Sequence, residues 1–147
     1  MIRQETDDAR KIREAVHARM KRSGATRLMG FSLEALERGR AVMRMDVRER
    51  HKQVHGVVHG GVLATLADTT AALAAYSVLP RGQELATIEL KINYMLPISE
   101  GPARAEGKVL RVGRNFVVTE CEIRTHKGDL AAKALLTFGA ASGKRLG

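Results

Sequence analysis

The strongest constraint on the fold is a long segment with almost no charge in an otherwise highly charged chain. Asp68 is the one Asp, Glu, Lys or Arg between Val54 and Pro80, whereas such residues make up 28% of the 147-residue sequence. Small and apolar residues from Gly60 to Val78 predict one long helix, which Pro80 and Gly82 end. A helix this apolar has to be covered by the rest of the chain. Asp68, the Gly and Thr residues and two His make the segment too polar for a membrane span.

The remaining residues are predicted to form the elements that cover this helix. Thr6 to Arg22 has helical spacing of apolar residues and predicts an amphipathic helix, ended by Ser23-Gly24. Alternation with period two predicts six strands, at Phe31–Leu36, Ala41–Val47, Ala86–Tyr94, Ala103–Val112, Val117–Ile123 and Leu130–Phe138. We expect Thr87 to face away from Ile88 and Leu90, and the last four strands to form a meander. Strands segregated from helices indicate an α+β fold in which an antiparallel sheet curls around the long helix.

Asp68 is the candidate for chemistry. On a helix its neighbours three, four and seven residues away are small, namely Gly61, Ala64, Thr65, Ala71, Ala72 and Ala75. The opposite side carries Leu63, Leu66, Thr70 and Leu73, which we expect to pack into the sheet. A carboxylate with space beside it on a buried helix is a candidate base or nucleophile, while an Asp that only bonds a neighbouring loop is the structural alternative.

His59-Gly60-Gly61 stands where the long helix begins. The first backbone N–H groups of a helix have no partners within it, so they suit a negatively charged or polarised oxygen. Gly60 precedes Asp68 by eight residues, a little over two helical turns. One helix therefore need not bring both groups together, whereas an antiparallel helix from a second subunit could place its Asp68 opposite this N-terminus.

Metal and disulfide chemistry find little support. The single cysteine, Cys121, cannot form an internal disulfide or a cysteine-based zinc site. His51, His55 and His59 have helical spacing, but Gly56 argues against a helix there, and we expect no metal. Gln53, in the same loop, is a neutral hydrogen-bonding group.

Three segments of the sequence resemble the hotdog-fold acyl-CoA thioesterases, in the branch that is similar to phenylacetic-acid-degradation proteins. They are Gln53-Val-His-Gly-Val-Val-His-Gly-Gly-Val-Leu-Ala-Thr-Leu-Ala-Asp68, Thr87-Ile-Glu-Leu-Lys-Ile-Asn-Tyr-Met-Leu-Pro97 and Val112-Gly-Arg-Asn-Phe-Val-Val118. The length of 147 residues predicts a single domain over residues 1–147, and the resemblance implies a curved antiparallel sheet around one central helix at residues 31–140. The helix within residues 1–24 is an addition to this core.

The resemblance also implies site residues. Asp68 would be the general base or nucleophile, the Gly60 N–H would polarise the thioester carbonyl, and Gln53 and His59 would complete the catalytic group. Gln53 stands where relatives often have Asn. Gly61 and Thr87 would contact the substrate. The substrate would be an acyl-CoA or aryl-CoA, with no separate cofactor, and the active sites would lie between the subunits of a homodimer or homotetramer.

The chain carries more basic than acidic residues, and this excess is unevenly distributed along the sequence. The net charge is +9, but residues 54–98 carry two basic and three acidic residues, so the excess lies outside the catalytic segment. We expect Arg111 and Arg114 to hold the phosphates of coenzyme A. A nucleic-acid binder is not favoured, because aromatics are 3% of the chain and no binding motif is present. A cytoplasmic location is expected, with no membrane partner. The open alternatives are a non-catalytic acyl-CoA-binding protein and a hydratase or dehydratase that uses His59.

Overall fold

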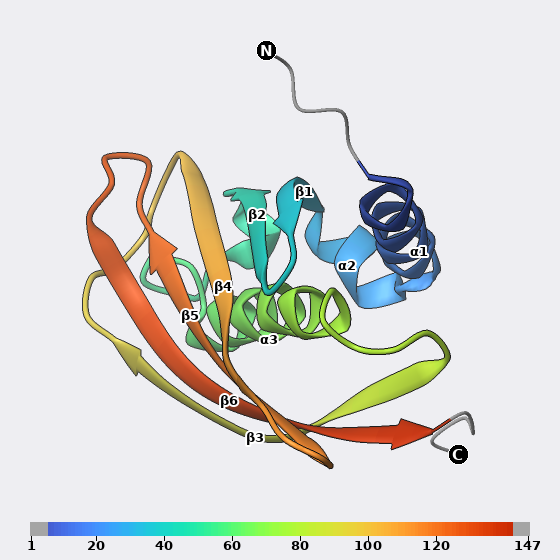
Figure 1. Ribbon diagram of the computed structural model, residues 1–147. Coiled ribbons are helices and arrows are strands. Elements are labelled where there is room, and N and C mark those ends of the chain that lie inside the picture. The colour runs from blue at the N-terminus through green and yellow to red at the C-terminus, as the bar shows by residue number, and fades with distance from the viewer. Residues whose placement is uncertain (1–5, 143–147) are drawn as a thin grey trace.

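A computed structural model describes residues 6–142 (Figure 1), so the ends of the predicted domain, residues 1–5 and 143–147, lie outside the described residues. The elements, in chain order, are α1 (Asp7–Arg22), α2 (Gly24–Met29), β1 (Phe31–Glu37), β2 (Arg40–Asp46), a 3-10 turn (Glu49–His51), α3 (Gly60–Tyr76), β3 (Gln83–Tyr94), β4 (Pro102–Val112), β5 (Phe116–Arg124) and β6 (Leu130–Ser142). None of the helices in this described part has the length and hydropathy that crossing a bilayer requires.

The six strands form one curved antiparallel sheet in the order β1-β2-β4-β5-β6-β3. The predicted meander is therefore wrong at one point, because β3 pairs with β6 and β4 pairs with β2. The seven residues between β3 and β4, 95–101, carry the chain from one part of the sheet to another. This arrangement leaves β1 and β3 as the two edge strands, and it confirms the predicted α+β hotdog architecture.

Helix α3 lies in the concave side of the sheet (Figure 1). Its predicted apolar side is confirmed, since Leu63, Leu66, Thr70 and Leu73 are all buried. The small-residue stripe near Asp68 is only partly open. Ala71 and Ala75 are fully buried, and a Cβ at Gly107 of β4 would lie 3.0 Å from the Ala71 backbone. Small residues on both elements therefore bring α3 into close contact with the sheet.

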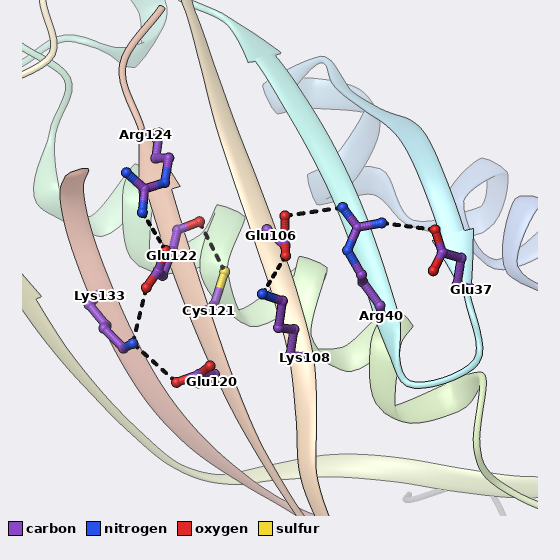
Figure 2. Close-up of polar contacts among 9 residues, drawn as sticks. All are labelled: Glu37, Arg40, Glu106, Lys108, Glu120, Cys121, Glu122, Arg124 and Lys133. Atoms are coloured by element: carbon purple, nitrogen blue, oxygen red, sulfur yellow. Dashed lines mark hydrogen bonds and ion pairs between the residues drawn. The ribbon is translucent and has the colours of Figure 1, made fainter. Parts of the chain in front are cut away.

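The outer face of the sheet is charged. Arg40 on β2 pairs with Glu37 and with Glu106 on β4, and Lys108 pairs with the same Glu106 (Figure 2). A second group joins Lys133 on β6 to Glu120 and Glu122 of β5, where Glu122 also pairs with Arg124. Much of the charge on this face is thus neutralised by ion pairs between residues of the face itself.

Helix α1 begins as the sequence predicts, with the Thr6 hydroxyl accepting from the Ala9 N–H. The six-residue helix α2 was not predicted. Ser23, expected only to end α1, also begins α2, because its hydroxyl oxygen accepts from the Thr26 N–H. Val16 anchors α1 in the core. Residues of α1 and of the chain after α3 border a cavity of about 490 Å³ whose lining includes Tyr76 and Glu84, but not Gly60, Asp68 or Thr87.

Candidate active site

Asp68 is half-buried and has no cationic partner among residues 6–142. Its carboxylate accepts one hydrogen bond, from the Thr87 hydroxyl to Oδ1 at 2.7 Å. Burial raises the pKa of Asp68 above its ordinary value, and the hydrogen bond from Thr87 opposes that rise. The result is a carboxylate that is oriented through one oxygen by a neutral donor, which suits a base better than a structural ion pair does.

Thr87 reaches Asp68 because β3 is irregular. Thr87 pairs with Phe138 and Glu89 pairs with Thr137, so Ile88 has no partner on β6. One extra residue in a strand reverses the facing of every side chain beyond it. Thr87 therefore faces α3, and the expectation that it shares a face with Glu89 is wrong.

The Gly60 N–H lies at the first position of α3 and has no acceptor within the described chain. It is the group to which the family resemblance assigns the thioester carbonyl oxygen. Gly60 and Asp68 are eight residues apart on one helix, which separates them by about 12 Å along the axis. A single carbonyl cannot touch both groups of one protomer.

His59 caps α3, because its Nδ1 accepts from the Gly61 N–H at 2.9 Å. In neutral His59 the proton is therefore on Nε2. The Gly61 N–H, predicted to contact substrate, is already engaged by this bond. His59 and Asp68 are also about 13 Å apart along the helix, so one protomer does not contain the carboxylate–histidine pair of a hydratase.

Gln53 lies in the compact loop before α3. Its side-chain oxygen accepts from the His55 N–H at 2.6 Å, and its backbone N–H and C=O bond Val57 and Gly56. The amide thus folds back on its own loop, and no hydrogen bond joins it to Asp68. Its predicted role in orienting water or substrate stays a prediction.

Arg111 and Arg114 lie at the tip of the β4–β5 hairpin. Arg111 pairs with Val118 across a second irregularity at Leu110, which turns it to the outer face, whereas Asp68 lies inside the curve of the sheet. The row Thr87–Phe138–Val117–Val112 connects this tip to the site across three strand pairs. That row spans roughly 15 Å, so the arginines do not contact Asp68 within one protomer.

The histidines do not form a metal site in the described chain. His51 is buried, with Nδ1 accepting from the Arg48 N–H and Nε2 facing the Met29 carbonyl. Burial lowers the pKa of His51, which keeps the ring neutral in this structural role. Within residues 6–142, no three His, Cys, Asp or Glu side chains are grouped as metal ligands would be.

Tyr94 is a site residue that sequence reasoning missed. Its hydroxyl donates to the Gly60 carbonyl at 2.7 Å, and a Cβ at Gly60 would lie 3.1 Å from the Tyr94 ring. The glycine at position 60 thus lets a side chain of the protein approach the backbone closely. Tyr94 was part of the alternating pattern that predicted the strand, but no local signal connected it to Gly60.

Comparisons with known proteins lead to one family. The model of the thioesterase superfamily matches residues 55–132. A Saccharolobus solfataricus protein whose name assigns it to the esterases is 42% identical over 100 residues, covering 68% of this chain and 71% of its own. The 1,4-dihydroxy-2-naphthoyl-CoA hydrolase of Escherichia coli is 32% identical over 93 residues, covering 63% and 68%.

A solved structure leads to the same family. The Haemophilus influenzae thioesterase HI1161 superposes with a TM-score of 0.82 at 28% identity, covering 88% of this chain and 90% of that one. The family match includes the start of α3, Asp68 and Thr87. The chain therefore belongs to the thioesterase superfamily and is a thioester hydrolase of the hotdog fold.

Proposed function

We propose that the chain hydrolyses acyl-CoA or aryl-CoA thioesters, with Asp68 as the general base or nucleophile. The observation that carries the proposal is the state of this carboxylate, which is half-buried, free of cations in the described chain and oriented by Thr87. The CoA ester of the Escherichia coli relative supports the substrate class. Aryl and alkyl acyl groups both fit this chemistry.

The reaction needs one group to bind the carbonyl oxygen and one to activate the attack. The Gly60 N–H would bind the oxygen, where negative charge develops as the carbonyl carbon becomes tetrahedral. In one route, water adds to this carbon as Asp68 takes its proton, the C–S bond breaks, and Asp68 returns the proton to the thiolate. In the other, Asp68 attacks the carbon and coenzyme A leaves, and water then hydrolyses the mixed anhydride.

A second protomer would complete the site. Gly60 and Asp68 of one chain are too far apart to share a carbonyl, whereas an antiparallel copy of α3 would bring Asp68 of one chain to Gly60 of the other. Edge strand β3 offers a surface for this pairing, since Ile88 is 61% exposed and Tyr94, like Met95 directly after the strand, is about half exposed. We propose a homodimer built on this strand, with a homotetramer formed from two dimers.

The arginines would act on the coenzyme part of the substrate. Arg111 and Arg114 face outward at the hairpin tip, and no ion pair engages either within the described residues. Exposed guanidinium groups of this kind bind phosphate oxygens, singly or in pairs. They would hold the phosphates of coenzyme A away from the groups that act on the thioester.

The test is turnover of a panel of acyl-CoA thioesters, followed by release of free thiol. Burial raises the pKa of the Cys121 thiol to about 12, so the folded protein adds little background to this readout. We expect Asp68→Asn to lower kcat by at least about 100-fold, the effect of removing a general base. Asp129→Asn, in the exposed turn before β6, is the control and should match the wild type.

Two results would contradict the proposal. Asp68→Asn with wild-type kcat would remove Asp68 from the mechanism. Binding of acyl-CoA without turnover by the wild type, for every ester of the panel, would indicate the non-catalytic binding protein instead. Oxygen-18 label in Asp68 after a single turnover in labelled water identifies the nucleophilic route, with water attacking the Asp68 carbonyl of the anhydride, because the general-base route puts label only into the product acid.

A further inference from the structure

Tyr94 stands at the end of β3 and holds the first turn of α3 from outside the helix. Its hydroxyl donates to the Gly60 carbonyl at 2.7 Å, and its ring lies against the Gly60 Cα. A first-turn carbonyl of a helix also accepts from the residue four positions later, so the Tyr94 bond is an addition to normal helix bonding. The contact is therefore specific to this tyrosine and does not follow from α3 being a helix.

The Gly60 carbonyl belongs to the same peptide unit as the Gly61 N–H. That N–H donates to His59 Nδ1 at 2.9 Å. The hydroxyl of Tyr94, the Gly60–Gly61 peptide and the His59 ring thus form one chain of hydrogen bonds, in which each bond polarises the next. Gly60 is held at its carbonyl by Tyr94, and its own N–H, on the preceding peptide, stays open.

We propose that Tyr94 is a positioning residue, which fixes the Gly60 N–H for the thioester carbonyl and sets the His59 ring with its Nε2–H outward. The inference rests on the proposed function, because it gives the Gly60 N–H the task of binding the carbonyl oxygen. It assigns Tyr94 no contact with the substrate.

The irregularity at Ile88 supports this role. Thr87 and Tyr94 are seven residues apart, so a regular strand would point them to opposite faces. The unpaired Ile88 lies between them and brings both to the α3 side. Strand β3 thereby contacts both functional groups of α3. The Thr87 hydroxyl bonds the Asp68 carboxylate, and the Tyr94 hydroxyl bonds the Gly60 carbonyl.

The Gly60 N–H would act mainly in the transition state, and this determines which kinetic constant the loss of Tyr94 changes. A donor aimed at a developing oxyanion contributes more to the transition state than to the bound ester. Looser positioning of that N–H should therefore lower kcat and leave KM nearly unchanged. The loss of one neutral hydrogen bond corresponds to a decrease of about three- to tenfold.

The experiment compares Tyr94→Phe with Tyr76→Phe in the full chain. Phenylalanine at 94 keeps the ring on Gly60 and removes only the hydroxyl. Tyr76 is the matched control, since its hydroxyl donates to Glu84 and accepts from the Leu85 N–H, away from the site. We expect kcat to fall about three- to tenfold for Tyr94→Phe, with KM unchanged, and both constants to stay at wild type for Tyr76→Phe.

Nitrogen NMR of the imidazoles gives a second readout that needs no turnover. Wild-type His59 should show the Nε2–H tautomer, and Tyr94→Phe should shift it toward a mixture of the two tautomers, while Tyr76→Phe should not. Unchanged kcat together with an unchanged His59 tautomer in Tyr94→Phe would overturn the inference. If no thioester is hydrolysed by the wild type, the proposed function fails, and the NMR result alone then decides whether Tyr94 positions this turn.

Discussion

At the scale of single residues, Asp68 and Thr87 act as one unit. Burial raises the pKa of Asp68, and the Thr87 hydroxyl lowers it by bonding the charged form. A carboxylate with a raised pKa is a stronger base than an ordinary exposed one. Thr87 thus orients Asp68 and opposes the rise in its pKa that burial causes.

Substitution of Thr87 by valine keeps the shape of the side chain and removes the donor. The charged form of Asp68 then loses a hydrogen bond, so its pKa should rise further. Because Asp68 acts deprotonated, the acidic limb of the kcat/KM profile should move to higher pH. Thr87→Ser retains the hydroxyl and should keep the wild-type limb. A limb that moves equally in both variants, or in neither, would show that Thr87 does not tune Asp68.

At the scale of elements, the contact between α3 and β4 depends on a glycine. A Cβ at Gly107 would lie 3.0 Å from the Cα and N of Ala71 and from the Thr70 carbonyl oxygen. These are backbone atoms of a buried helix, so they cannot move aside as a flexible side chain would. The absence of a side chain at Gly107 therefore determines how closely α3 approaches the sheet. This distance in turn fixes the position of Asp68.

Gly107→Ala should lower the free energy of unfolding by about 1–3 kcal/mol, the usual cost of overpacking, measured by urea denaturation. Gly24→Ala is the matched control. No atom lies within 4 Å of a Cβ built there, and alanine suits a helix, so this variant should be neutral or slightly more stable. Equal stability of Gly107→Ala and the wild type would show that α3 can move away from β4.

The ion pairs of the outer face predict how the sheet responds to acid. Hydrogen bonds from Arg40 and Lys108 lower the pKa of Glu106 from 4.5 to about 2. A depressed pKa stabilises the folded state above the unfolded value, and this stability is lost as pH falls from about 4.5 toward 2. Glu106 is partly exposed, so solvent reduces the contribution to about 1 kcal/mol or less. Urea denaturation should show Glu106→Gln less stable than the wild type at pH 7 and equal to it at pH 2.

Most of the helices and strands, and Asp68, could be predicted from the sequence. The features that could not be predicted have physical causes. The uncharged segment predicted α3 and Asp68, and period-two alternation predicted all six strands. The strand order could not be read, because alternation does not say which edges pair. The extra residue at Ile88 looks like any strand isoleucine, so the facing of Thr87 could not be predicted. Tyr94 was missed because its contact with Gly60 joins residues 34 positions apart.

At the scale of the whole molecule, charge is arranged in separate regions. The net charge is +9, yet the outer face of the sheet pairs its bases with acids. Arg111 and Arg114 remain outside these pairs at the hairpin tip. The positive surplus thus includes two exposed arginines at the hairpin tip, which under the proposed function would meet an anionic substrate.

Arg114→Ala should raise KM for an acyl-CoA several-fold while leaving kcat nearly unchanged, because it removes a binding contact remote from the carbonyl. The same acyl group on a short thiol without phosphates provides the internal control, and its KM should not change. Added salt should raise the KM of the wild type for the acyl-CoA toward that of the variant. A KM that rises equally for both esters would place Arg114 in folding or in acyl binding.

Under the proposed function, each active site takes Asp68 from one protomer and Gly60 from another. Two inactive variants test it by mixing. Asp68→Asn removes the base, and Gly60→Pro removes the N–H at a first helical position, where its Cβ also presses against the Tyr94 ring. In a mixed dimer, one site would have both groups intact and the other neither. After the two variants are unfolded and refolded together in equal amounts, we expect about a quarter of wild-type kcat to return. Activity no higher than that of the separate variants, with mixed dimers confirmed by mass spectrometry, would contradict a shared site.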